Sequence, residues 1–339
     1  MPRPFPWLRA LDRVEPGQGF TRRRFLAGLG VLAAGALCAP LASRIRIGRV
    51  TSVEVERPAL GTWVRIVARS DEPARAERAI EHAFAAIARV DRQMSIHRAD
   101  SQLSRVNRAA GIATVHVDDA VLEVVARARS RAMRSQGVYD PTVLPLMRLY
   151  GFYGAGQERY PSDREIGEAL DRVGWRHVAV NRAAGTLGLT RRGAGLDLGS
   201  IGKGWAVDRA VAALEAEGIE SGLVDVGRNV YGLGTPGDRS SGWPVGVIHP
   251  RTGAVEHVFT LRDRAVATSG NAEQHHLQGG TMVGHLLDAR HGRPAAGPLS
   301  ATVLARTGTD ADGTSTVAFL LGADAVRAWP EPLAVHVIG

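Results

Sequence analysis

Residues Gly195–Asp208, with the sequence GLDLGSIGKGWAVD, carry the only lysine in this chain of 339 residues. The other 41 basic residues are arginines, and Lys203 lies between two glycines, shortly after Asp197. The stretch is not a P-loop, because Asp197 and Gly204 stand where that motif needs a glycine and a serine or threonine. Glycines that admit an anion, a helix beginning nearby and a compact ammonium are still the components of a phosphate site. A glycine-rich turn that merely begins an ordinary helix is the alternative.

A second segment, Asp310–Gly322 (DADGTSTVAFLLG), places two oxygen-bearing side chains four residues apart. A helix over roughly Gly313–Leu321 is predicted here, so Asp312 and Thr316 would lie on one face at its start. Hard oxygen ligands suit Mg²⁺, which prefers a few protein ligands together with phosphate oxygens and water. A helix-capping aspartate followed by a buried threonine is the alternative.

A third segment, GHLLDARHGRP, contains His285 and, three residues later, Asp288. A histidine with a carboxylate close by can act as an oriented base, although a lone histidine is more often structural. The preceding His275 and His276 are interpreted as loop residues, because adjacent histidines are poorly placed to bind one metal ion together.

Taken in order along the chain, these segments and several others resemble the ApbE family of exported FAD:protein FMN transferases. The similar segments are ALGT, SIHRADSQLSRVN, YDPTVLPLMRLYGF, DLGSIGKGWAVDRA, VDVGRN, ATSG, HLLDARHGRP and DADGTSTVAFLLG. The resemblance runs from about residue 52 to the C-terminus. Its patterns D-x-G-x-I-x-K-G, H-x-x-D and D-x-x-x-T are specific in combination.

The resemblance implies a role for each matching residue. It implies Mg²⁺ held by Asp312, Thr316 and the backbone carbonyl of Gly202. It implies FAD as the substrate, with its pyrophosphate near Lys203, and it implies that His285 assists proton removal. Lys203 and His285 are thus the implied catalytic residues. The implied contacts to the flavin or its phosphates are Leu60, His97, Asp140, Thr142, Asp197, Ser200, Lys203, Thr268, Ser269 and Gly270.

Several positions depart from the family's usual pattern. Leu60 replaces a usual methionine, and His97 replaces a usual tyrosine whose ring stacks on the flavin. Gly227-Arg228-Asn229 stands where Gly-Gly-Asp is usual, so a carboxylate is missing and a cation is present. Gly202 replaces a usual alanine and Ala289 a usual proline. These departures leave the tightness of the FAD pocket and the choice of acceptor open.

Apolar periodicity and turn residues predict an α+β fold of mixed sheets with packed helices. The mixed order of helices and hairpins argues against a doubly wound parallel sheet. The resemblance implies that the FAD site lies in a cleft between two subdomains. The predicted helices cover about 72–95, 118–134 (with Met133 pointing inward), 163–173 and 201–217; hairpins are predicted at 51–70 and 177–193, and short strands between 221 and 306.

The N-terminal segment Thr21–Ser43 is typical of an export signal. Its Arg22-Arg23 pair resembles that of the twin-arginine route, and the Gly- and Ala-rich apolar run of 17 residues that follows is short for a membrane helix. We predict residues 1–43 as a twin-arginine signal peptide, 44–51 as a linker and 52–339 as the catalytic domain, located in the periplasm. Cys38, the only cysteine, lies within the signal, and the preceding Leu37 argues against a lipid anchor there.

The formal net charge of +8 does not indicate a nucleic-acid partner. Residues 1–42 carry six arginines against Asp12 and Glu15, which is about half of the excess. The other arginines are scattered, with few aromatic residues among them, whereas nucleic-acid sites cluster basic residues. The resemblance implies FAD and an acceptor flavoprotein as partners, and the N-terminal signal implies the twin-arginine export machinery.

Residues and resemblance together predict a Mg²⁺-dependent FAD:protein FMN transferase. It would attach FMN to a Thr or Ser hydroxyl of a periplasmic or membrane-associated flavoprotein and release AMP. One possible acceptor is a respiratory flavoprotein such as that of the nitrous-oxide reductase system. Two alternatives remain open at this level: a Mg²⁺-dependent FAD pyrophosphatase that uses water as the nucleophile, and a non-catalytic FAD-binding protein.

Overall fold

The computed structural model describes residues 41–47, 50–154, 159–271, 275–278 and 281–339. Its centre is a sheet of eight strands in the order β1-β2-β3-β7-β8-β11-β16-β17, and every pairing in it is antiparallel. The strands are β1 (Leu41–Ile47), β2 (Val50–Ala59), β3 (Thr62–Ser70), β7 (Ser221–Val226), β8 (Asn229–Leu233), β11 (Arg264–Ser269), β16 (Ser300–Ala305) and β17 (Pro332–Ile338).

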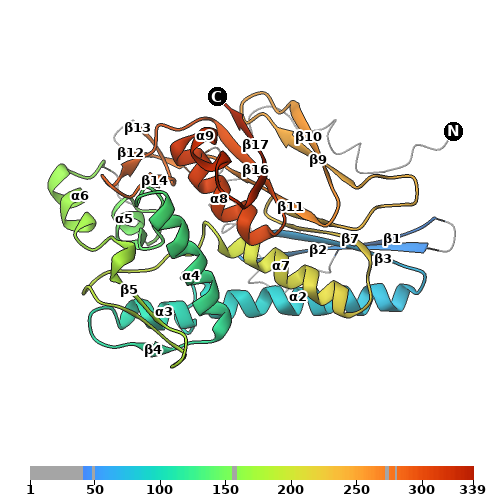
Figure 1. The fold of residues 1–339 in the computed structure, drawn as a ribbon, viewed down its shortest axis with the longest axis horizontal. Coiled ribbons are helices and arrows are strands. Elements are labelled where there is room, and N and C mark those ends of the chain that lie inside the picture. The colour runs from blue at the N-terminus through green and yellow to red at the C-terminus, as the bar shows by residue number, and fades with distance from the viewer. Residues whose placement is uncertain (1–40, 48–49, 155–158, 272–274, 279–280) are drawn as a thin grey trace, which may run out of the picture.

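Helices α2 (Pro73–Met94), α7 (Gly202–Ala216) and α8 (Gly308–Leu321) cover one face of this sheet (Figure 1). In β3, Val64, Ile66 and Ala68 point toward the helices and are fully buried. Val67 points to the opposite face, as the period of two along a strand requires. The short helix α9 (Ala323–Arg327) follows α8.

The opposite face of the sheet is covered by the hairpin of β9 (Trp243–Ile248) and β10 (Val255–Leu261), on the right in Figure 1. Phe259 and Leu261 from this hairpin pack with Val67 and Leu223 of the sheet in a separate apolar cluster. Both faces of the sheet are therefore buried, at least in part.

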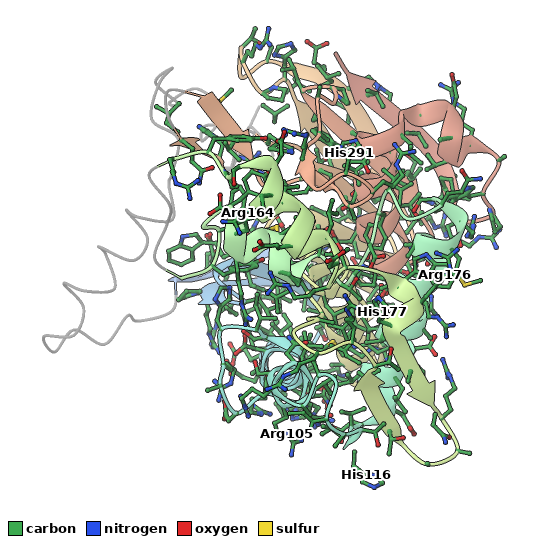
Figure 2. All side chains as sticks on the ribbon, turned by 90° about the vertical axis from the view of Figure 1, so that its left-hand side faces the viewer. Arg105, His116, Arg164, Arg176, His177 and His291 are labelled. Atoms are coloured by element: carbon green, nitrogen blue, oxygen red, sulfur yellow. The ribbon has the colours of Figure 1, made fainter. Side chains whose placement is uncertain are left out.

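The remaining elements form a second unit, on the left in Figure 1 and turned toward the viewer in Figure 2, where His116 lies at the bottom and His291 toward the top. A small core of Leu146, Tyr150, Ile166, Val283 and Leu287 joins its upper part. Its elements are α3 (Gln102–Arg108), β4 (Val115–His116), α4 (Asp119–Arg134), α5 (Leu144–Leu149), α6 (Asp163–Leu170), η3 (Trp175–His177), β5 (Val178–Asn181), β6 (Thr186–Leu189), β12 (His275–Gln278), β13 (Thr281–Gly284), β14 (Leu287–Asp288) and β15 (Arg293–Pro294).

The α+β class is confirmed, and so are the helix predicted over 72–95, which is α2 in the structure, and the hairpins formed by β2 with β3 and by β5 with β6. Three predictions are wrong in detail. Residues 44–47 and 50–51 of the expected linker lie in β1 and β2, because the backbone of this segment pairs antiparallel with β2 at the edge of the sheet. Met133 is 52% exposed, since the buried face of α4 runs through Val125, Ala128 and Ala132 and Met133 lies beside that face. Residues His275 and His276 belong to β12 rather than a loop.

The predicted signal peptide falls on residues 1–43, of which 1–40 lie outside the described residues, so it stays a prediction. Within the described ranges, none of the helices has the length and apolar character needed to cross a membrane.

Candidate functional site

The turn before α7 is held by Asp197. This carboxylate is 8% exposed; its Oδ1 accepts a hydrogen bond from the Gly199 backbone N–H (2.8 Å) and its Oδ2 accepts one from the Tyr153 hydroxyl (2.8 Å). The Lys203 ammonium donates to the Gly199 carbonyl (3.2 Å), which closes the turn from the helix side. The N-cap residue of α7 offers no side-chain acceptor. This helix start is therefore not an ordinary capped terminus.

The acceptor for the first turn of α7 comes from α8. Asp312 Oδ2 accepts a hydrogen bond from the Gly204 N–H at 2.8 Å, and Asp312 Oδ1 lies 3.9 Å from Lys203 Nζ. The two segments that the sequence singled out, 108 residues apart, therefore meet at one carboxylate. Asp312 is only 4% exposed and Thr316, one turn further along α8, is 6% exposed.

Helix α8 begins earlier than predicted, which changes the position of Asp312. Its N-cap is Thr307, whose hydroxyl accepts a hydrogen bond from the Asp310 N–H (3.1 Å). Asp312 is thus the fifth residue of the helix, and the capping alternative for it is wrong. Its carboxylate is free to act across the helix pair rather than on its own helix.

Two glycines make the close approach of α7 and α8 possible. A Cβ at Gly204 would lie 2.1 Å from the Gly308 carbonyl oxygen, and a Cβ at Gly308 would lie 2.6 Å from the Gly204 carbonyl oxygen. No side chain fits at either position without a shift of backbone. Gly202, by contrast, has no atom within 4 Å of where its Cβ would be.

Asp140 and Thr142 form a buried clasp. Asp140 accepts hydrogen bonds from the Thr142 N–H (2.8 Å) and hydroxyl (2.6 Å) and from the Trp175 N–H (2.7 Å), while the Thr142 hydroxyl accepts one from the Gly174 N–H (2.6 Å). Burial raises the pKa of Asp140, although these hydrogen bonds act to lower it. The clasp joins the loop that precedes α5 to η3, so these predicted flavin contacts have a structural role of their own.

Ser200 donates a hydrogen bond to the Tyr139 hydroxyl at 3.0 Å. Burial raises the pKa of Tyr139 to about 12, so this hydroxyl stays protonated near neutral pH and serves as a hydrogen-bonding group rather than a base. The ring of His97 stands edge-on to that of Tyr153, with 5.3 Å between centroids. His97 is thereby linked, through Tyr153, to Asp197 in the turn before α7.

Leu60 and Arg228 lie in two tight turns at the same end of the sheet. Both have the left-handed backbone conformation that favours glycine, with φ of 51° and 69°. A Cβ at Gly227 would lie 2.7 Å from the hydroxyl of Thr62, which shows how closely the two turns pack. Two of the departures from the family pattern are therefore neighbours in space.

The end of β11 carries the predicted Thr268–Gly270 loop. The Thr268 hydroxyl is 2.9 Å from that of Thr302 on β16, and the Ser269 hydroxyl is 2.8 Å from that of Ser315 and 3.2 Å from that of Thr316. Ser269 and Thr316 are therefore brought together, which links this loop to the predicted metal ligand on α8.

His285 follows β13, and its ring faces that of Phe152 edge-on at 6.3 Å. The carboxylate of Asp288 binds Arg290 (Nη2 at 2.8 Å) and His291 (Nε2 at 3.1 Å; labelled in Figure 2). Burial acts to raise the pKa of Asp288, but these partners leave it below its ordinary value. The Asp288 carboxylate therefore bonds to residues of its own turn.

The residues expected to hold Mg²⁺ form a set of oxygen donors rather than an acidic cluster. In the described part of the chain, no group of three or more His, Cys, Asp or Glu residues could hold a metal ion. The carboxylate of Asp312, the hydroxyl of Thr316 and a carbonyl at the start of α7 are hard oxygen donors, and a set this small suits an ion that keeps phosphate and water ligands. The donors present thus fit Mg²⁺.

Sequence reasoning missed three polar residues that organise this region. Arg131 is 2% exposed and pairs with Asp310 of α8 (2.7 Å), Tyr153 holds Asp197, and Asp208 binds the start of α8. In the sequence, Arg131 stands where the apolar pattern of this helix calls for a core residue. A charged residue at such a position was the one sign of a buried ion pair. A described pocket of about 220 Å³ lies beside Asp208, and none of the predicted flavin contacts lines it.

Comparisons with known proteins agree with this arrangement. A family model described as the ApbE family matches residues 60–338. A protein of Treponema pallidum named FAD:protein FMN transferase is 33% identical over 293 residues, covering 81% of each chain. The crystal structure of an ApbE protein from Thermotoga maritima matches with a TM-score of 0.76 at 31% identity, covering 84% of this chain and 93% of that one. The flavin transferase ApbE from Vibrio cholerae matches with a TM-score of 0.75 at 27% identity, covering 85% and 93%.

Proposed function

This chain belongs to the ApbE family and is a transferase, and we propose that it transfers FMN from FAD to a protein hydroxyl in a Mg²⁺-dependent reaction. The observation that carries the proposal is the meeting of Lys203, the Gly204 N–H and Asp312 where α7 approaches α8. A cation, a helix N-terminus and a buried carboxylate at one point suit a pyrophosphate bound together with a metal ion.

In this proposal the pyrophosphate of FAD lies against the turn at 199–204. Asp312, Thr316 and the Gly202 carbonyl would hold Mg²⁺, which supplies Lewis-acid stabilisation of the phosphate oxygens when bound. The Lys203 ammonium adds positive charge where the leaving phosphate of AMP gains negative charge. Because Lys203 is fixed by the Gly199 carbonyl, its position needs little reorganisation during the reaction.

The acceptor contributes a Thr or Ser hydroxyl. Its oxygen forms a bond to the FMN phosphorus, the bond from that phosphorus to the AMP oxygen breaks, and His285 takes the hydroxyl proton. His97, Leu60 and the Thr268–Gly270 loop would contact the flavin, on the family's pattern. The FAD site between the two units of the fold, and the identity of the acceptor, are part of this proposal.

The reaction is tested with purified protein from residue 41 onward, FAD, Mg²⁺ and a flavoprotein domain that carries a candidate Thr or Ser. We expect a covalent fluorescent band on the acceptor and one AMP per flavin attached. Asp312→Ala should abolish the band. Release of free FMN and AMP without an acceptor would identify a pyrophosphatase, and FAD binding without any product would identify a binding protein.

We also propose that the chain acts in the periplasm after twin-arginine export, on the basis of Arg22 and Arg23. Replacing both by lysine should retain the protein in the cytoplasm, measured by fractionation of cells that express the full chain. Export of the double variant at the unaltered rate would reject this route.

A further inference from the structure

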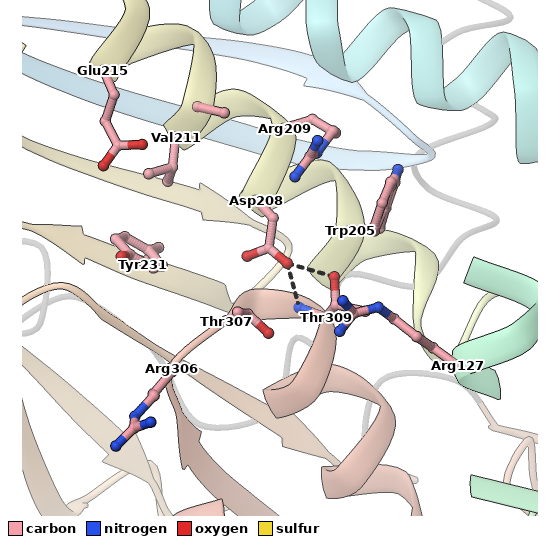
Figure 3. A pocket seen from close by; sticks show the side chains of 11 residues that line it. Arg127, Trp205, Asp208, Arg209, Val211, Glu215, Tyr231, Arg306, Thr307 and Thr309 are labelled. Carbon is pink, nitrogen blue, oxygen red and sulfur yellow. Dashed lines mark hydrogen bonds between the residues drawn. The ribbon is translucent and has the colours of Figure 1, made fainter. Parts of the chain in front are cut away.

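Asp208, the last residue of the stretch GLDLGSIGKGWAVD, has no place in the proposed reaction, yet it is among the most heavily bonded carboxylates of the fold. It lies on α7 and accepts hydrogen bonds from the backbone N–H groups of Gly308 (2.6 Å) and Thr309 (2.9 Å), and from the Thr309 hydroxyl. Figure 3 shows the two bonds to Thr309. A carboxylate on one helix thus occupies the N-terminus of another.

The same two helices are joined again one turn away. Four residues back along α7, Gly204 donates to Asp312, which lies four residues beyond Gly308 on α8. The helices are therefore antiparallel. Their register is fixed by two contacts, Asp208 with Gly308 and, one turn away, Gly204 with Asp312.

We propose that Asp208 is a positioning residue: it sets the register of α7 and α8, and so the spacing between Lys203 and Gly202 on one side and Asp312 and Thr316 on the other. This inference rests on the proposed function, because that spacing matters only if the two sides hold one Mg²⁺–FAD complex. Loss of a group that orients a metal ligand typically lowers metal affinity by about 10- to 100-fold.

Thr307 offers a matched control, because it caps the same helix without reaching α7. Its hydroxyl accepts from the Asp310 N–H (3.1 Å) and donates to Asp310 Oδ2 (2.8 Å), and both bonds stay within α8 and its cap. If Asp208 only stabilises the helix terminus, Asp208→Ala and Thr307→Ala should behave alike. If Asp208 sets the register, only its loss should alter the metal site.

The experiment titrates Mg²⁺ into each protein in the presence of FAD and follows flavin fluorescence, alongside thermal unfolding. We expect both variants to melt earlier than the wild type. The half-saturating Mg²⁺ concentration should rise about tenfold or more in Asp208→Ala and stay within about twofold in Thr307→Ala. Asp208→Asn, which keeps the shape of the side chain, should fall between wild type and Asp208→Ala, and it takes the place of Asp208→Ala if that variant does not fold.

Chemical rescue separates register from general stability. Asp208 lines the open pocket of about 220 Å³, together with Arg127 and Arg209, so formate can reach the position that Asp208→Ala vacates (Figure 3). Formate should lower the half-saturating Mg²⁺ concentration of Asp208→Ala toward that of the wild type. It should leave the wild type and Thr307→Ala unchanged.

Each outcome decides between the two claims. Equal Mg²⁺ titrations for wild type and Asp208→Ala, or equal shifts for the Asp208 and Thr307 variants, would reject the positioning role alone. A wild type that binds FAD without any response to Mg²⁺ would reject both the proposed metal site and this inference. Mg²⁺-dependent FAD binding without transfer to any acceptor would reject the proposed function and leave the positioning role intact.

Discussion

Lys203 is the one position where a chain rich in arginine uses lysine, and the placement of its two oxygen partners suits a compact ammonium. Its ammonium lies between the Gly199 carbonyl at 3.2 Å and the Asp312 carboxylate at 3.9 Å. A guanidinium is broader, planar and directional, so it cannot take the same place with the same contacts. Charge alone is therefore not the property that this position requires.

We predict that Lys203→Arg keeps the charge and still lowers flavin transfer by about tenfold or more, because misplacement of a charge near the reacting phosphate is costly. The measurement is the initial rate of acceptor labelling at saturating FAD. Arg209→Lys, a reverse exchange on the same helix, serves as the control and should leave the rate near that of the wild type. A Lys203→Arg enzyme with full activity would remove the steric explanation.

Asp288 gives a pH-dependent prediction. Its folded pKa is below its ordinary value of about 3.9, so the charged carboxylate stabilises the fold above that value, and the stabilisation is lost as pH falls through the lowered pKa. At pH 7, Asp288→Asn should lower the free energy of unfolding by about 1 kcal/mol, the upper end for solvent-screened ion pairs, because Arg290 and His291 are about half exposed. Urea unfolding at pH 7 and at pH 3 should show the difference between the two proteins shrink with acid. A difference that grows with acid would contradict the assigned pairing with Arg290 and His291.

At the scale of elements, the contact between α7 and α8 depends on the absence of side chains at two positions. Gly204→Ala would place a methyl group 2.1 Å from the Gly308 carbonyl oxygen and force the helices apart. Such overpacking typically costs about 1–3 kcal/mol. The shift would also break the bond between the Gly204 N–H and Asp312. We therefore predict that Gly204→Ala loses both stability and flavin transfer.

Gly202→Ala is the matched comparison, because it lies two residues earlier and has free space for a Cβ. Alanine is favoured over glycine in helices by roughly 0.5–1 kcal/mol, so this variant should unfold at the same temperature as the wild type or higher. Differential scanning calorimetry of the two variants provides the test. Similar melting temperatures for both would show that the helices can separate at little cost.

Elements with a clear period could be predicted from the sequence, and elements without one could not. The helix at 73–94 buries Ile80, Phe84 and Ile87 on one face, which makes its spacing visible. Helix α8 is buried on nearly every side and has no apolar stripe, so the sequence pattern predicts a start near Gly313, whereas the helix begins at Gly308. The basic segment at 44–51 predicts a linker, because it has no long apolar pattern, whereas the structure places residues 41–47 in the edge strand β1.

Individual residues of the candidate site could be predicted from the sequence, but the hydrogen bonds between them could not. Local patterns identified Lys203 and Asp312 separately, and resemblance placed them in one site. The hydrogen bond between the Gly204 N–H and Asp312, and the one between Asp208 and Gly308, join residues about a hundred positions apart. Contacts of this kind depend on how helices pack, which no short stretch of sequence records.

At the scale of the whole molecule, the central sheet connects the site to the N-terminal edge. Strand β1 pairs with β2 along seven residues, and Arg44 on β1 forms an ion pair with Glu77 on α2. β2 in turn leads into the turn at Leu60, next to the predicted flavin site. The predicted signal, 1–43, overlaps the first three residues of β1, so the position of cleavage decides how much of this strand the mature protein keeps.

We predict that a chain beginning at residue 50 is less stable than one beginning at residue 41, because it lacks β1 and exposes the edge of β2. Unpaired strand edges promote self-association, so the shorter chain should also form oligomers at concentrations where the longer chain does not. FAD binding should persist in the shorter chain, because the turn at Leu60 is still held by the pairing of β2 with β3. Urea unfolding and light scattering of the two chains measure both effects. Equal unfolding curves would mean that β1 adds nothing to the sheet in solution, and the mature N-terminus could then lie beyond it without loss.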